Sequence, residues 1–159
     1  MKVLHNSLEK ANIDSLNTFQ LKVWNILCSL FEKLKVSQLS NKSSIGMGLG
    51  IDVFLMLKKS DFILYISVTG HDLYINSKYF DIYVYPEIEM DKLELLLKQV
   101  MLGEYSIKLG YASNGKLLSK ELIFTAKELE EFNESRKYGL FARQVISKKR
   151  IGGIQFVDI

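Results

Sequence analysis

The chain is poor in cysteine, histidine and proline, with one, two and one of them among 159 residues. With the single cysteine Cys28, no disulfide can form within the chain, so we expect a reducing, cytoplasmic compartment. One proline and ten glycines leave little room for long linkers, which predicts a single domain over residues 1–159. Residues 1–6 turn polar after one lysine, so we expect no signal peptide.

Recognisable catalytic and metal-binding patterns are also scarce. The two histidines and the cysteine lack the spacing of a zinc site, and P-loop, kinase and nucleophile-elbow patterns do not occur. Gly46, Gly48 and Gly50 alternate within a strand-like pattern, whereas a dinucleotide loop needs its third glycine one place later, before a helix. We therefore predict no enzymatic activity, no metal and no cofactor. A small-ligand pocket near the glycine-bearing strand is one alternative.

The net charge of the chain is small, but charges of one sign are concentrated in three segments. The net charge of +3 is too small to imply a polyanionic partner, and no apolar run approaches the roughly 20 residues that cross a bilayer. Residues 136–150 carry six Lys and Arg and no acid, whereas residues 81–94 and 121–134 each have a local charge of −4. The basic segment, with Tyr138 and Phe141 for base stacking, gives a second alternative, a nucleic-acid-associated protein.

Hydrophobic periodicity predicts a helix followed by strands. Apolar residues at three- and four-residue steps predict a long helix over residues 15–35, capped by Asp14 or Ser15. From residue 45 to 57 the period changes to two, which predicts one strand. Further runs separated by short turns predict an antiparallel meander, with strands over residues 62–69, 73–75 and 79–85.

Residues 90–124 give the clearest local prediction, a helix over residues 90–102 that ends at Gly103 and then a hairpin over residues 105–124. Asn114-Gly115 favours a type I′ turn, which needs positive φ at both central positions. Such a turn fixes the register, because a shift of one residue would move the apolar side chains to the other face. The expected cross-strand pairs are Tyr105 with Phe124, Ile107 with Leu122, Tyr111 with Leu118, and Ala112 with Leu117.

These elements together predict the fold class. Thr125 and Glu128 form a capping-box pattern, which predicts a further helix reaching Glu134 or beyond. We expect an α+β domain with a curved antiparallel sheet of about five to seven strands. A long N-terminal helix and shorter later helices would pack on this sheet.

The strand over residues 79–85 and its acidic flank supply the candidate binding residues. If Phe80, Ile82 and Val84 enter the core, three tyrosines and an aspartate share the opposite face, and tyrosine suits protein interfaces. The alternative is that a second layer covers this face, and that the acids beyond it only face the positive end of the next helix. The candidate partner-binding residues are Tyr79, Asp81, Tyr83, Tyr85, Glu87, Glu89, Asp91, Glu130, Glu131 and Glu134.

The segment Leu102 to Ile107, leading into Asn114-Gly115-Lys116-Leu117, resembles small bacterial immunity proteins of polymorphic or contact-dependent inhibition toxin systems. The resemblance implies an α+β protein that binds and neutralises a cognate toxin, such as a nuclease, by occluding its active site. Acidic and aromatic side chains often make that contact in such proteins, but no binding residue carries over by position. The function expected on this basis is a non-enzymatic protein-binding module with a toxin as partner.

Overall fold

The computed structural model describes residues 13–47, 50–60, 62–85, 87–138, 145 and 147–157. They divide into two compact units, one within residues 1–90 and one within residues 91–157. The single-domain assignment stays a prediction. The α+β class is confirmed, but the strands form two antiparallel sheets, of five and four strands, in place of the one sheet expected.

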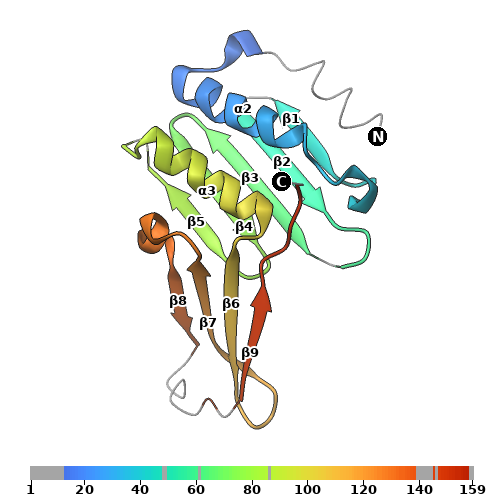
Figure 1. Ribbon diagram of the computed structural model, residues 1–159, viewed down its shortest axis with the longest axis vertical. Helices are drawn as coiled ribbons and strands as arrows, with labels where there is room; N and C mark the ends of the chain where they lie inside the picture. The colour runs from blue at the N-terminus through green and yellow to red at the C-terminus, as the bar shows by residue number, and fades with distance from the viewer. Residues whose placement is uncertain are drawn as a thin grey trace. The chain divides into compact units, whose positions relative to one another are not determined.

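The sheet of the first unit is an antiparallel meander whose strands follow one another in chain order (Figure 1). The predicted strand over residues 45–57 is wrong, because this segment forms two paired strands of a hairpin. Gly50 begins the second of them, and a Cβ there would lie 3.1 Å from the carbonyl carbon of Val68. Gly50 therefore marks a close backbone approach at the start of the second strand. The strands are β1 (Ser44–Met47), β2 (Gly50–Met56), β3 (Ile63–Thr69), β4 (Asp72–Ser77) and β5 (Asp81–Val84).

The N-terminal helix, α2 (Thr18–Phe31), is shorter than predicted. Its N-cap is Asn17, not Asp14 or Ser15, because Asn17 and Gln20 form a reciprocal capping box. It ends near Phe31, after which the backbone bonds span three residues, as from the Leu34 N–H to the Phe31 carbonyl. Short 3₁₀ turns flank it, namely η1 (Ile13–Ser15) and η2 (Val36–Gln38).

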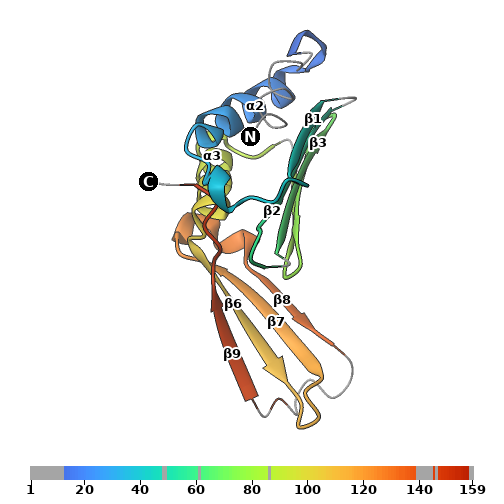
Figure 2. The same cartoon turned by 90° about the vertical axis from the view of Figure 1, so that its right-hand side faces the viewer.

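The helix α2 lies against one face of the first sheet, as Figure 2 shows. Alternate residues of the strands are buried on that face, which is the period of two expected for a half-covered sheet. The opposite face therefore carries the remaining side chains of the strands. The fully buried strand residues are Ile51, Val53, Leu55, Leu64, Ile66, Val68, Leu73 and Ile75, and those of the helix are Val23 and Leu27.

The second unit contains α3 (Met90–Leu102), apart from its first residue, and a sheet with the strand order β8-β7-β6-β9. The predicted helix over residues 90–102 is confirmed. Gly103 ends it with a φ of 71°, and the Glu104 N–H bonds to the Gln99 carbonyl at 2.9 Å, as in a Schellman motif. The strands are β6 (Tyr105–Tyr111), β7 (Leu117–Phe124), β8 (Glu134–Lys137) and β9 (Ser147–Gly152).

The register of the β6–β7 hairpin is as predicted up to Gly110, with Tyr105 opposite Phe124 and Ile107 opposite Leu122. Beyond a bulge after Gly110 the prediction is wrong, because Tyr111 faces Leu117. Only Gly115 has a positive φ at the turn, so the type I′ turn is also wrong. The Gly115 N–H bonds to the Ala112 carbonyl at 3.0 Å, which is a type I turn followed by a glycine bulge.

The capping box predicted at Thr125 does not form. Its hydroxyl donates to the Glu104 carbonyl at 2.9 Å instead, and the following segment is a 3₁₀ helix, η3 (Lys127–Phe132). The Phe124 N–H bonds to the Asn133 side chain, which helps turn the chain into β8. Tertiary contacts at both ends of η3 thus replace the local cap.

Candidate functional site

The uncovered face of the first sheet brings together tyrosines and aspartates from four strands. The cross-strand register places Asp52 of β2 beside residue 67 of β3, and Tyr74 of β4 beside Tyr83 of β5. Side chains opposite each other on paired strands point to the same face, about 4.5–5.5 Å apart. We call this surface the tyrosine–aspartate face, formed by Asp52, Tyr65, Tyr74, Asp81, Tyr83 and Tyr85.

Hydrogen bonds between strands hold the tyrosines and aspartates of this face in place. The Tyr65 hydroxyl donates to an Asp52 oxygen at 2.6 Å, and the Tyr74 hydroxyl donates to an Asp81 oxygen at 2.8 Å. Asn76 also donates to Asp81. The bond to Asp52 raises the pKa of Tyr65, while partial burial and then the bond to Asp81 raise the pKa of Tyr74. Both hydroxyls therefore keep their protons at neutral pH.

Two tyrosines of the face project into solvent. Tyr83 is 63% exposed and Tyr85 is 70% exposed, the highest values among the large hydrophobic residues that the structure describes. The ring of Tyr83 lies 4.5 Å, centroid to centroid, from the ring of Tyr74. That contact limits the freedom of the Tyr83 side chain, so little rotamer entropy remains to be lost when a partner covers it.

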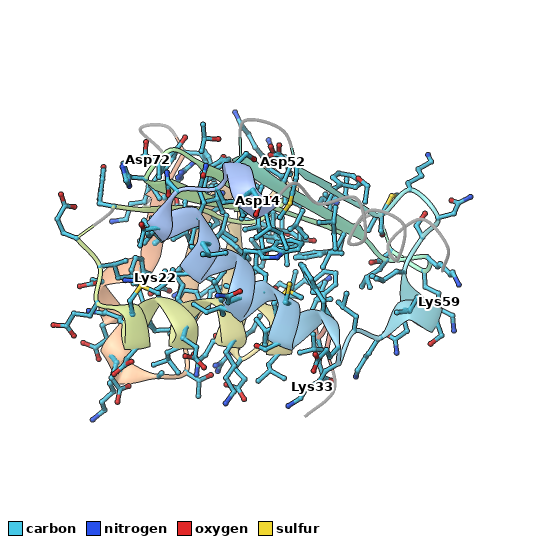
Figure 3. The ribbon with its side chains drawn as sticks, turned by 90° about the horizontal axis from the view of Figure 1, so that it is seen from above. Asp14, Lys22, Lys33, Asp52, Lys59 and Asp72 are labelled. Atoms are coloured by element: carbon cyan, nitrogen blue, oxygen red, sulfur yellow. The ribbon has the colours of Figure 1, made fainter. Side chains whose placement is uncertain are left out.

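The charge of the face has one sign. The five strands of the first sheet contain three aspartates, Asp52, Asp72 and Asp81, and no lysine or arginine. Figure 3 shows Asp52 and Asp72 on the side of the sheet turned away from α2. Such a surface attracts a basic partner, over about 8 Å at physiological ionic strength.

The candidate residues predicted from the strand over 79–85 reach this face in part. Asp81, Tyr83 and Tyr85 lie on it, whereas Tyr79 lies in the turn before β5 with its ring 6.0 Å from the ring of the buried Phe62. Glu87 and Glu89 are exposed between β5 and α3. Sequence reasoning missed the strand partners of the face, Asp52, Tyr65 and Tyr74, although the same period-two alternation could have marked them.

The other predicted acidic residues belong to the second unit, and two of them form ion pairs within it. Glu131 of η3 forms an ion pair with Lys92 at 2.8 Å, and Glu134 pairs with Arg136 in β8. Asp91 and Glu130 are exposed, at the first turn of α3 and on η3. Intramolecular partners thus occupy two of the four acids predicted here as partner-binding residues.

The described ends of the basic segment 136–150 lie in β8 and β9, the two edge strands of the second sheet. Arg136 and Lys149 point to one face, while Lys137, Lys148 and Arg150 point to the other, because alternate residues of a strand face opposite ways. Arg143 and Phe141, also part of that prediction, lie outside the described residues. The basic charge is therefore divided between two faces.

Other candidate groups give no evident reaction centre. His71 is an exposed turn residue, and burial raises the pKa of the half-buried Cys28 thiol. Within the described ranges, no group of three or more His, Cys, Asp or Glu side chains is arranged to hold a metal ion. No helix in that part of the chain combines the length and apolarity needed to cross a bilayer. An open hollow of about 440 Å³ lies beside Ser37, Gln38, Lys58 and Lys59, at the opposite end of β2 from Gly50.

In comparisons with known proteins, no family model, no curated protein and no solved structure matches the chain.

Proposed function

We propose that this chain is a non-enzymatic protein-binding module whose tyrosine–aspartate face docks a basic protein. In keeping with its resemblance to immunity proteins, the partner we propose is a cognate toxin, held with its active site covered. The observation that carries the proposal is the pairing of two largely exposed tyrosines with a sheet whose strands carry only acidic charge.

The physical chemistry of the face favours a folded protein over a small molecule. Tyr83 and Tyr85 stand on a sheet surface, where they offer large apolar area and hydroxyl groups to a broad partner. The bonds from Tyr65 to Asp52 and from Tyr74 to Asp81 make the face rigid before binding. A basic partner would also approach faster, since opposite charges steer the encounter.

The test uses the protein encoded beside this chain as the probe, since immunity proteins are normally encoded next to their toxins. Its affinity is measured by titration calorimetry for the wild type, for Tyr83→Ala with Tyr85→Ala, and for Tyr138→Ala as the control. Tyr138 is 38% exposed and lies outside the face. An interface tyrosine that acts as a hot spot contributes about 2 kcal/mol or more, so even if only one of the two does so, the double variant should bind at least about 30-fold more weakly.

Two further variants distinguish the contribution of the tyrosine–aspartate face to binding from that of the neighbouring acidic residues. Charge reversal at Glu87 and Glu89 tests whether the interface extends past β5, and a loss of affinity there would enlarge the proposed surface. Unchanged affinity in the Tyr83 and Tyr85 double variant would rule out the face as the docking site. Absence of any binding to the neighbouring gene product would refute the immunity role.

A further inference from the structure

One face of the second sheet carries a row of two small residues between two lysines. The register aligns Lys137 of β8, Ser119 of β7, Gly110 of β6 and Lys148 of β9 in a row across the sheet. Neighbouring strands are about 4.8 Å apart, so the two lysines stand about 14 Å from each other at their backbones. The two residues between the lysines are small. The Cγ atoms of Val145 lie 3.0 and 3.1 Å from where a Cβ on Gly110 would be, so the Val145 side chain covers Gly110.

A hollow of about 240 Å³ lies over this row of residues. Its lining comes from all four strands and is mostly polar or charged: Lys108, Leu109, Gly110, Ser119, Lys120, Glu121, Ser135, Lys137 and Lys148. Pockets that enclose a whole small molecule are typically about 300–1,000 Å³ and largely apolar. This hollow is smaller and basic, which suits a single anionic group of a ligand.

The charges around the hollow leave two cations available. Lys108 pairs with Glu121 at 3.4 Å, which neutralises both. Among the residues that the structure describes, neither Lys137 nor Lys148 has a carboxylate within ion-pair distance. Arg150, in the adjacent row, donates to the Ser106 hydroxyl at 3.2 Å and adds positive charge to the same face. The hydroxyls of Ser119 and Ser135 supply donors of the kind that bind phosphate oxygens.

We propose that this hollow binds a phosphate group, held between Lys137 and Lys148 with the hydroxyls of Ser119 and Ser135 beneath it. The site is separate from the tyrosine–aspartate face and belongs to the other unit. The phosphate would come either from a small phosphorylated compound or from the backbone of a single-stranded nucleic acid. These sources share one chemistry at the hollow and differ in how strongly binding depends on salt.

The experiment measures binding of two probes, inorganic pyrophosphate by calorimetry and a fluorescent single-stranded oligonucleotide by anisotropy. Lys137→Gln with Lys148→Gln removes both free cations. The matched control is Arg136→Gln with Lys149→Gln, which changes the adjacent residues of the same strands by the same charge but on the opposite face. Lys148→Gln against Lys149→Gln alone repeats the comparison if either double variant folds poorly, as judged by its melting temperature.

We expect the Lys137 and Lys148 variant to bind at least about tenfold more weakly and the control to bind nearly as well as the wild type. For the oligonucleotide, the magnitude of the slope of log K against log salt should also fall by about 0.7, the amount expected for one lost phosphate contact on a single strand. Pyrophosphate binding assigns the site to a small phosphorylated compound, and oligonucleotide binding alone assigns it to nucleic acid. Binding of neither probe, or equal weakening in both variants, overturns the proposal.

Discussion

Replacement of Gly103 by alanine should destabilise the second unit through both backbone conformation and packing. Gly103 has a φ of 71°, a left-handed conformation that costs an L-residue about 1–2 kcal/mol. An added Cβ would also lie 2.7 Å from the Ile154 carbonyl carbon and 2.9 Å from that of Gly153. Both neighbours are backbone atoms that no rotamer change can move, and such overpacking costs about 1–3 kcal/mol more.

Gly115 provides the matched control for this change. Its φ is 78°, but nothing lies within 4 Å of a Cβ placed there, so Gly115→Ala should cost only the conformational part, about 1–2 kcal/mol. The entropy that alanine removes from the unfolded chain is common to both variants and cancels between them. The difference in unfolding free energy between Gly103→Ala and Gly115→Ala therefore measures how closely residues 153–154 approach the end of α3.

Urea denaturation followed by far-UV circular dichroism checks the magnitude. We expect the free energy of unfolding to fall by about 2–5 kcal/mol in Gly103→Ala, against a total that is usually about 5–15 kcal/mol. A downward shift of the midpoint without a change in slope would show that the native state itself is weakened. Equal losses in the two variants would refute the packing of residues 153–154 against Gly103.

Two further predictions concern the polar contacts of Tyr105 and Asn17. Burial raises the pKa of Tyr105 to about 12, so the folded chain keeps a proton that the unfolded chain loses near pH 10. The free energy of unfolding should therefore drop by about 2–3 kcal/mol as the pH rises from 10 to about 12. Tyr105→Phe should lose that pH dependence in a series of denaturation curves. An unchanged pH profile in this variant would contradict the burial of the Tyr105 hydroxyl. Asn17→Ala removes the cap of α2 and the bond to the Gly70 carbonyl, and should cost about 1–2 kcal/mol, whereas Asn17→Asp, which keeps the acceptor, should cost less. Equal melting temperatures for these two variants would argue against the capping role.

Local signals in the sequence predicted the elements whose contacts are also local. The helix before Gly103 and the strand alternation of the first sheet depend on short-range patterns, and both were predictable. The Asn114-Gly115 turn was predictable as a turn but not in type, because the bulge after Gly110 changes the register by one residue. The division into two sheets depends on long-range pairing, such as that of β6 with β9, which no local pattern encodes.

The candidate site could likewise be predicted only where it depends on local patterns in the sequence. The outward positions of Asp81, Tyr83 and Tyr85 come from the alternation of one strand, so the sequence predicted them. The same alternation places Asp52 and Tyr65 outward on β2 and β3, but their contact with each other depends on the register between the two strands, which periodicity alone does not give. The lysines of the second sheet were visible as a basic segment, but their division between two faces required the strand order.

Hydroxyl-radical footprinting of the chain, alone and with the protein encoded beside it, tests the proposed docking face most directly. Tyrosine side chains react readily when they are exposed, as Tyr83 and Tyr85 are at 63% and 70%. We predict that both lose most of their labelling in the complex, while Tyr138 keeps its own. Unchanged labelling of Tyr83 and Tyr85 in a complex that has formed would contradict the account.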